Sequence, residues 1–295
     1  MYSKVADGVY VIDTGGLGFD RTIACYLIHS DKVALVDAGY ARGYDRIMST
    51  LRELGISSLD FIIPTHVHLD HYGCTGLLAK AFPNSRILAH KRAAKHVIDP
   101  SRVLESARSI FGERIAGMFG DTLPVEESRV EVVDDGAIVR VGDSELRIIY
   151  TPGHAPHQLS VYDERRKILI TADAVAINYP DFPAILPTTP PPSFDPDEAV
   201  RTIHRIAELD AELLLTPHFG PREGGGDYLE RNAERIREWV EKVDRLSREG
   251  KGHGEIVETL VGELAREVGA QKAPPYVVGS VHVSVLGMLK HLGRL

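Results

Sequence analysis

The chain has 295 residues, 34 Lys and Arg against 42 Asp and Glu, a formal net charge of −8 and 43% hydrophobic residues. This composition is that of a soluble globular protein, and its acidic balance disfavours a nucleic acid partner because like charges repel the phosphate backbone. No apolar run approaches the roughly 20 residues that cross a bilayer, and the start of the chain has no apolar signal core. Two cysteines cannot build a disulfide framework, so we expect a cytoplasmic protein.

Side-chain amides are scarce. The chain contains three Asn and two Gln, whereas Arg and Glu are abundant. Depletion of heat-labile amides is one mark of proteins from hot habitats, and biased genome composition produces the same pattern. We therefore expect a thermophilic source, with base bias as the alternative.

The first 90 residues alternate short apolar runs with turns. The runs are rich in β-branched and aromatic residues, which favour strands, and glycine or proline ends the helical patterns. We expect strands over residues 8–13, 22–28, 32–37, 61–63 and 85–89. Helices are expected over residues 44–54 and 73–81.

A helical insert interrupts this pattern from about residue 91 to 120, where apolar residues recur at spacings of three and four. Strand patterns resume over residues 130–133, 137–139, 146–149, 159–162 and 168–170. Prolines are then so frequent up to residue 196 that the stretch is predicted to be a loop, because proline blocks both sheet ladders and helix interiors.

The rest of the chain is mainly helical. A helix over 198–209 and a strand over 212–215 precede a run of three glycines, and further helices are expected over 228–249, 255–268 and 281–291. Two β-rich halves, each with helices, predict an α+β protein in which two sheets pack face to face with helices outside. We expect residues 1–225 to form the catalytic domain and residues 226–295 to form a helical region that packs on it.

Histidines and carboxylates cluster directly after the strand predicted over 61–63. The sequence there reads His66-x-His68-x-Asp70-His71. In extended chain, residues i and i+2 point the same way, so His66 and His68 converge, while Asp70 and His71 turn into the following helix. Burying three imidazoles and a carboxylate without a cation would be costly. A solvated polar loop is the weaker interpretation.

Three further strands end in a residue that can bind a metal. Residues 148–153 lead to His154, residues 168–172 lead to Asp173, and residues 213–217 lead to His218. Each alone is weak evidence, because a single histidine at a strand end is usually structural. Together with the first cluster they supply five His and two Asp from four strand ends, which is the ligand inventory of a two-metal site.

This order of ligands resembles that of the metallo-β-lactamase-fold hydrolase superfamily, and within it the branch that contains glyoxalase II. The resemblance spans roughly residues 8 to 220 and implies a four-layer αββα sandwich with the metals at one edge of the paired sheets. It assigns to the first metal His66, His68 and His154. It assigns to the second metal Asp70, His71 and His218. Asp173 would bridge the two ions, and Asp37 matches the family's acid beneath the site.

The family chemistry implied by these ligands is hydrolysis. Two divalent cations lower the pKa of a shared water and place a hydroxide between them, which attacks the carbonyl of a small ester, thioester or lactone. Asp70 is the candidate catalytic residue, because its carboxylate could steer the nucleophile and accept its proton. Zinc is the expected metal, with iron or manganese as alternatives that the ligand set also fits.

Other reactions of the superfamily stay open. The sequence has no Lys-x-Asn motif of the kind that holds glutathione in glyoxalase II, which argues against glutathione thioesters. A mononuclear-iron persulfide dioxygenase would use two His and one Asp of the same inventory. A phosphodiesterase or nuclease would use the same metals, although the charge of −8 disfavours RNA.

Candidate substrate contacts follow the metal-binding residues along the chain. The proline-rich loop follows Asp173 and is a candidate rim, so Tyr179 and Phe182 are candidate substrate contacts. His157, three residues after His154, is a further candidate, with a structural role as the alternative. We expect a small-molecule substrate and no membrane partner, and a homo-oligomer is left open.

Overall fold

The computed structural model describes residues 1–177 and 179–295. Its strands form two sheets. The first sheet holds the N-terminal strands in chain order: β1 (Tyr2–Ala6), β2 (Val9–Asp13), β3 (Ala24–His29), β4 (Val33–Val36), β5 (Phe61–Ile63), β6 (Arg86–His90) and β7 (Val130–Val133). It is antiparallel from β1 to β4 and parallel from β4 to β7.

The second sheet has the order β13-β12-β11-β10-β9-β8. Its strands are β8 (Ile138–Val141), β9 (Ser144–Tyr150), β10 (Leu159–Asp163), β11 (Ile168–Ile170), β12 (Leu213–Thr216) and β13 (Gly220–Glu223). Of the pairs described in this sheet, only β11–β12 is parallel. Sequence patterning missed β13, because its Gly-Pro-Arg-Glu sequence has no apolar alternation and forms a strand by pairing with β12.

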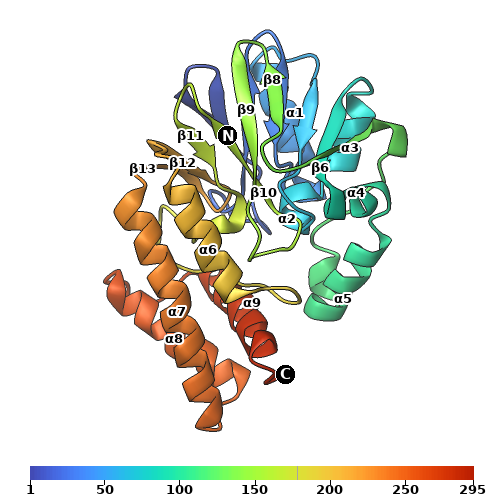
Figure 1. The fold of residues 1–295 in the computed structure, drawn as a ribbon. Helices are drawn as coiled ribbons and strands as arrows, with labels where there is room; N and C mark the ends of the chain where they lie inside the picture. Colours follow the sequence, from blue (N-terminus) through green and yellow to red (C-terminus); the bar gives the residue numbers. More distant parts are fainter. Residues whose placement is uncertain (178) are drawn as a thin grey trace.

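Helices cover the outer faces of both sheets (Figure 1). On the first sheet lie α1 (Tyr44–Glu53), α2 (Leu69–Tyr72), α3 (Thr75–Ala81), α4 (Lys91–Ile98) and α5 (Ser101–Ala116). On the second lie α6 (Pro196–Ala207) and the start of α7 (Gly226–Arg248), while α8 (His253–Glu267) and α9 (Pro275–His291) pack on α7 and on each other below the sheets in the view of Figure 1. A third apolar core lies between the sheets, so the predicted αββα sandwich is confirmed. Helices α4 and α5 occupy the predicted helical insert.

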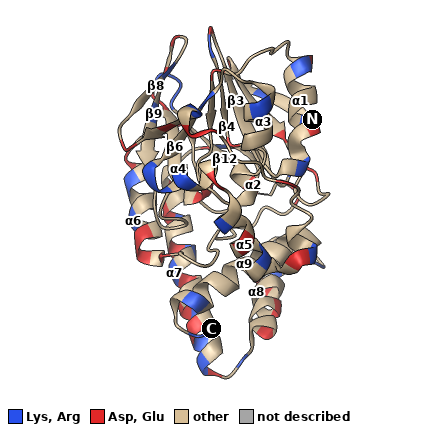
Figure 2. Cartoon of the chain, turned by 90° about the vertical axis from the view of Figure 1, so that its right-hand side faces the viewer, with Lys and Arg blue, Asp and Glu red and all other residues tan. Residues whose placement is uncertain are grey.

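The C-terminal helices combine a buried stripe with a charged outer face. Along α7 the buried residues recur at helical spacing, and they share one core with the second sheet. Basic and acidic residues alternate along the outside of α7, whereas the charged residues of α8 are mainly Glu (Figure 2). Helix α9 begins at Pro275 rather than at residue 281, because proline is well suited to the first turn of a helix. Among the described residues, no helix is both long enough and apolar enough to traverse a lipid bilayer.

The two sheets are joined at one edge. The amide of Leu159, on the second sheet, donates to the carbonyl of Thr65 after β5 at 2.9 Å. The amide of Ala24, on the first sheet, donates to the carbonyl of Pro217 after β12 at 2.8 Å. The ends of β5, β9, β11 and β12 therefore open toward the same edge, where the predicted ligands follow them.

Candidate metal centre

Three histidines converge at the joined edge of the sheets. Nε2 of His66 and Nε2 of His154 each lie 2.9 Å from Nδ1 of His68. Ligand atoms at about 2.0–2.1 Å from a tetrahedral zinc ion are about 3.4 Å apart, so this spacing is close to that of a shared ion. We call these three residues the first triad. His66 and His68 come from the extended segment after β5, and His154 follows β9.

His154 is held by its surroundings on both sides. Gly153 before it has φ +124°, and a Cβ there would lie 2.4 Å from the backbone of Ala199 on α6, so only glycine fits this approach. The Nδ1–H of His154 donates to the carbonyl of Thr188 at 3.0 Å. This bond leaves the Nε2 lone pair directed at the other two histidines.

A second group, which we call the second triad, consists of Asp70, His71 and His218. Asp70 Oδ2 lies 3.6 Å from Nε2 of both histidines. Asp70 and His71 occupy the first turn of α2, and His218 follows β12. Nδ1 of His218 donates to the carbonyl of Thr22 at 3.3 Å, which again leaves Nε2 free to bind a cation.

Asp173 lies between the two triads. It sits in the short 3₁₀ turn Ala172–Ala174 after β11 and is almost fully buried. Its Oδ2 lies 3.4 Å from Nε2 of His154 in the first triad. The same oxygen lies 3.3 Å from Nε2 of His218 and 3.6 Å from Nε2 of His71 in the second triad. One carboxylate oxygen thus contacts both groups.

Asp37 lies beneath the second triad. Its Oδ2 accepts a hydrogen bond from Nδ1 of His71 at 2.9 Å, and its Oδ1 accepts from the amide of Thr65 at 2.8 Å. A carboxylate in this position fixes which ring nitrogen carries the proton and increases the basicity of the other. The buried Asp37 therefore orients Nε2 of His71 toward Asp70 and Asp173.

The two triads differ in their electrostatics. Burial lowers the pKa of His68 to about 3 and that of His154 to about 4, and it holds the pKa of His66 well below 6.5. Burial also lowers the pKa of His71, but the carboxylates of Asp173 and Asp70 outweigh it, so the net pKa is well above 6.5. The pKa of His218 is raised for the same reasons. Burial thus favours neutral imidazoles in the first triad, whereas the carboxylates beside the second favour the protonated form of His71 and His218.

Two buried polar atoms in this centre have no hydrogen-bond partner among the described residues. They are Nε2 of His71 and Oδ1 of Asp173. Unpaired buried polar atoms are rare because each loses its hydration without compensation. Nitrogen and carboxylate oxygen are ligands that zinc, iron and manganese accept. The residues present therefore fit divalent cations, which would satisfy both atoms.

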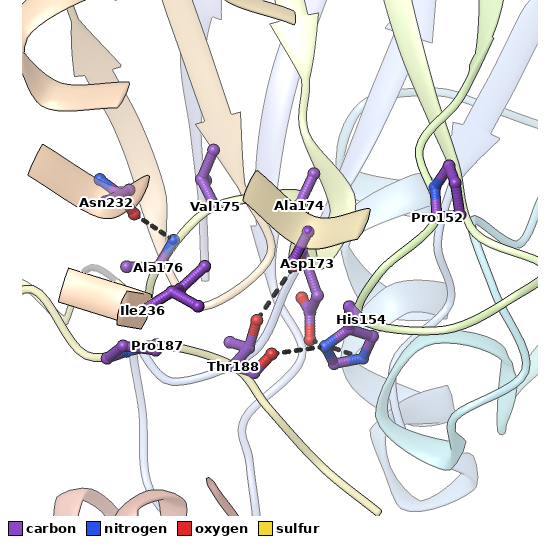
Figure 3. Close-up of a pocket in the computed structure, with 11 residues that line it drawn as sticks. Pro152, His154, Asp173, Ala174, Val175, Ala176, Pro187, Thr188, Asn232 and Ile236 are labelled. Carbon is purple, nitrogen blue, oxygen red and sulfur yellow. Dashed lines mark hydrogen bonds and ion pairs between the residues drawn. The ribbon is translucent and has the colours of Figure 1, made fainter. Parts of the chain in front are cut away.

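A small cavity of about 10 Å³ lies behind Asp173 (Figure 3). Its walls include His154, Asp173 and Thr188 together with Asn232 and Ile236 from α7. This volume is at the lower limit for one water molecule. The side of Asp173 that faces this cavity is therefore packed against α7.

The candidate substrate contacts occupy different surroundings. The Tyr179 hydroxyl lies 3.1 Å from Oγ of Ser280 on α9, and burial raises its pKa, as do the carboxylates of Asp70 and Asp173. His157 lies next to the first triad, with its ring centroid 6.3 Å from that of His66. Phe182 is 2% exposed in the core beneath the C-terminal helices, so the structure places its ring away from the surface.

Two residues near the centre escaped sequence analysis. The Tyr40 and Phe119 rings stack with centroids 4.8 Å apart, and burial raises the pKa of Tyr40, as does the Asp70 carboxylate. Thr188 bonds His154 through its carbonyl. No sequence signal identifies a backbone carbonyl as a partner of a ligand, and a lone tyrosine after a glycine has no distinctive spacing.

Residues 18–218 match the family model of the metallo-β-lactamase superfamily. The chain belongs to this superfamily. The matched range includes all seven ligands predicted from the sequence, and the fold and the His/Asp cluster imply that the protein binds metal. Membership of the glyoxalase II branch stays a prediction.

Relatives of this chain carry different names. Metallo-beta-lactamase fold-containing protein ST1585 of Sulfurisphaera tokodaii is 25% identical over 72% of this chain and 78% of its own length. Probable metallo-hydrolase MJ0888 of Methanocaldococcus jannaschii is 29% identical over 56% of this chain and 72% of its own. Coenzyme F420H(2) oxidase of Methanothermobacter marburgensis is 26% identical over 58% of this chain and 41% of its own length.

Solved structures show the same fold along nearly the whole chain. The metallo-beta-lactamase family protein TTHA1429 from Thermus thermophilus superposes with a TM-score of 0.73 at 20% identity. The superposition covers 98% of this chain and 94% of that protein, so it includes the C-terminal helices.

Proposed function

We propose that this protein is a dinuclear metal-dependent hydrolase that cleaves an ester, thioester or lactone bond of a small molecule in the cytoplasm. Both cysteines, Cys25 and Cys74, are buried and free, as is usual for proteins of a reducing compartment. A small-molecule substrate agrees with the acidic net charge of −8, which disfavours a nucleic acid.

The observation that carries the proposal is the position of Asp173 between the two triads. Its Oδ2 lies 3.4 Å from His154 Nε2 and 3.3 Å from His218 Nε2. A single carboxylate at this distance from two separate ligand groups is suited to bridge a pair of ions. A one-metal site would need only one of the triads and would leave the ligand-type side chains of the other largely buried without a cation.

The bound cations would supply a water of lowered pKa and would polarise the substrate carbonyl. Within this centre, the first triad contributes neutral imidazoles that burial keeps deprotonated, and Asp37 keeps His71 in the tautomer that presents Nε2. Asp70 is the proposed general base. Its side chain is 22% exposed, whereas that of Asp173 is 4% exposed, so Asp70 is the carboxylate that a nucleophilic water can reach.

Zinc is the metal proposed for both positions, with iron or manganese as alternatives. Five imidazoles and two carboxylates suit all three ions, and zinc binds such ligands in tetrahedral geometry with an open position for water. The relative named probable metallo-hydrolase supports a hydrolytic reaction.

The test combines metal analysis with a substrate panel. Purified protein should contain two divalent ions per chain and should hydrolyse at least one of a set of thioesters, esters and lactones. Turnover should disappear on exhaustive treatment with a chelator and return when metal is restored. Turnover that persists in protein shown to be metal-free would rule the proposal out.

An oxidoreductase of the same fold is the second candidate, because one relative is named coenzyme F420H(2) oxidase. A mononuclear-iron persulfide dioxygenase would contain one iron per chain and consume oxygen with a persulfide. Elemental analysis together with an oxygen electrode separates this candidate from the hydrolase.

A further inference from the structure

The loop before α6 contacts a member of the first triad and the bridging carboxylate through one residue. The carbonyl of Thr188 accepts from Nδ1 of His154 at 3.0 Å, and its hydroxyl donates to the carbonyl of Asp173 at 3.0 Å (Figure 3). The position of Thr188 therefore determines both the ring plane of His154 and the backbone that carries Asp173.

Helix α9 holds this loop on both sides of Thr188. The Ser284 hydroxyl donates to the carbonyl of Pro187 at 2.7 Å, and the Thr189 hydroxyl donates to the carbonyl of Ser284 at 3.0 Å. Ser284 and Thr189 are 2% and 1% exposed. A Cβ added at Gly287 would lie 1.8 Å from the carbonyl oxygen of Thr189, so the helix backbone packs directly on the loop.

Helix α7 makes a separate contact on the other side of Asp173. Asn232 is 1% exposed, and its side-chain oxygen accepts from the amide of Ala176 at 2.6 Å, three residues beyond Asp173. Its side-chain nitrogen donates to the carbonyl of Tyr228 at 2.6 Å within α7. The 3₁₀ turn that presents Asp173 is thus fixed at its start by β11 and after its end by α7.

We propose that α7 and α9 hold the proposed ligands Asp173 and His154 in the orientation that binds metal. Thr188 is the positioning residue through which α9 sets the affinity for the bound ions. This inference rests on the proposed ligand roles of His154 and Asp173. Both helices lie outside the range matched by the family model, which ends at residue 218. The C-terminal region would therefore control metal binding without supplying a ligand.

The physical basis is the orientation of the ligands. Groups that hydrogen-bond to metal ligands fix their rotation, and their loss typically weakens metal affinity by about 10- to 100-fold. The Thr188 hydroxyl is bonded to the backbone of Asp173 itself, and the Thr188 carbonyl is fixed by the anchored residues on either side. Loosening α9 should consequently weaken both metal positions, because Asp173 serves both.

The experiment compares metal affinity among four variants. Thr188→Val removes the hydroxyl at constant shape, Thr188→Ser retains it, and Ser284→Ala releases the loop from α9. Thr259→Val is the matched control, since the Thr259 hydroxyl bonds the carbonyl of Glu255 within α8. Zinc affinity is measured by competition with a chromophoric chelator, and the cobalt-substituted proteins are compared by their visible spectra. Melting of each metal-free variant is followed in parallel.

We expect Thr188→Val and Ser284→Ala to bind zinc at least about 10-fold more weakly than wild type and to show altered cobalt spectra. Thr188→Ser and Thr259→Val should behave as wild type, and metal-free melting of all four should change little. Wild-type affinity and spectra in Thr188→Val and Ser284→Ala would overturn the inference and leave the proposed function standing. Equal loss of stability with and without metal would show a merely structural role and would also overturn it. A wild-type protein that binds no metal would overturn the proposed function itself.

Discussion

The two triads lie side by side around Asp173, yet the pKa values of their histidines are shifted in opposite directions. In the first triad, burial lowers the pKa of each histidine, to about 3 for His68 and about 4 for His154. In the second, carboxylates raise the pKa of His71 and His218 despite burial. Burial alone therefore keeps the histidines of the first triad neutral. Burial beside carboxylates instead gives the histidines of the second triad a higher affinity for protons, and the same carboxylates attract metal cations.

Removing the Asp173 carboxylate should have the largest effect on metal binding and hydrolysis, because it lies beside both triads. If Asp173 is the proposed bridging ligand, Asp173→Ala should reduce hydrolysis to background and lower metal affinity by about 100-fold or more, because a direct ligand is lost rather than a partner of one. The measurements are the metal content after gel filtration and the turnover of the thioester, ester or lactone that the wild-type protein hydrolyses fastest. Asp181→Ala, which removes an exposed ion pair with Arg21, is the control. A variant that keeps both ions and full turnover would contradict the bridging role.

Lowering the pH should release metal from the two triads at different pH values. Protons compete with a cation for each imidazole, and the histidines of raised pKa bind protons first as the pH falls. We therefore expect an ion at the second triad to be released at a higher pH than an ion at the first. Metal content after equilibration in steps from pH 7.5 to 4.5 should pass through a plateau near one ion per chain. Simultaneous loss of both ions would show that the difference in pKa does not govern metal release.

Asp37→Asn should affect one triad only. The variant loses the charge that holds Nδ1–H of His71 at 2.9 Å, so affinity at the second triad should fall by about 10- to 100-fold while the first is unchanged. Stepwise zinc titration resolves the two affinities. Asp60→Asn is the control, because Asp60 accepts a backbone hydrogen bond at the opposite end of β5. Equal weakening of both positions would contradict the expectation.

His157→Leu should have the smallest effect. The His157 ring lies near the first triad, but its Nδ1 is buried without a partner among the described residues, so an apolar replacement removes an uncompensated polar atom. We expect unchanged metal content and a change in the free energy of unfolding below about 1 kcal/mol. If His157 contacts substrate, KM rises and kcat stays constant. Loss of metal from this variant would instead show that His157 helps to hold the metal-binding residues in place.

Sequence patterning predicted two packed sheets from the two β-rich halves, and the ligand-type residues that follow four of the strands predicted the metal site. The segment from His66 to His71 could be interpreted directly, since four ligand-type residues in six positions have few alternative explanations. Strand β13 could not be predicted, because pairing with β12 and not its own residues makes it a strand. Phe182 was expected at a rim because its loop follows Asp173, but the loop turns its ring into the core under the C-terminal helices.

The order of His, Asp and strand residues along the chain determined which side chains could meet and which family fold would bring them together. That information is local, because hydrophobic periodicity and ligand identity belong to single residues and their neighbours. The family resemblance already implied Asp173 between the two groups and Asp37 beneath them. Only the tertiary structure decided that Asp37 bonds Nδ1 of His71 and that α9 anchors Thr188 beside His154. Those contacts join segments tens of residues apart through backbone carbonyls and packing distances, which no residue type encodes.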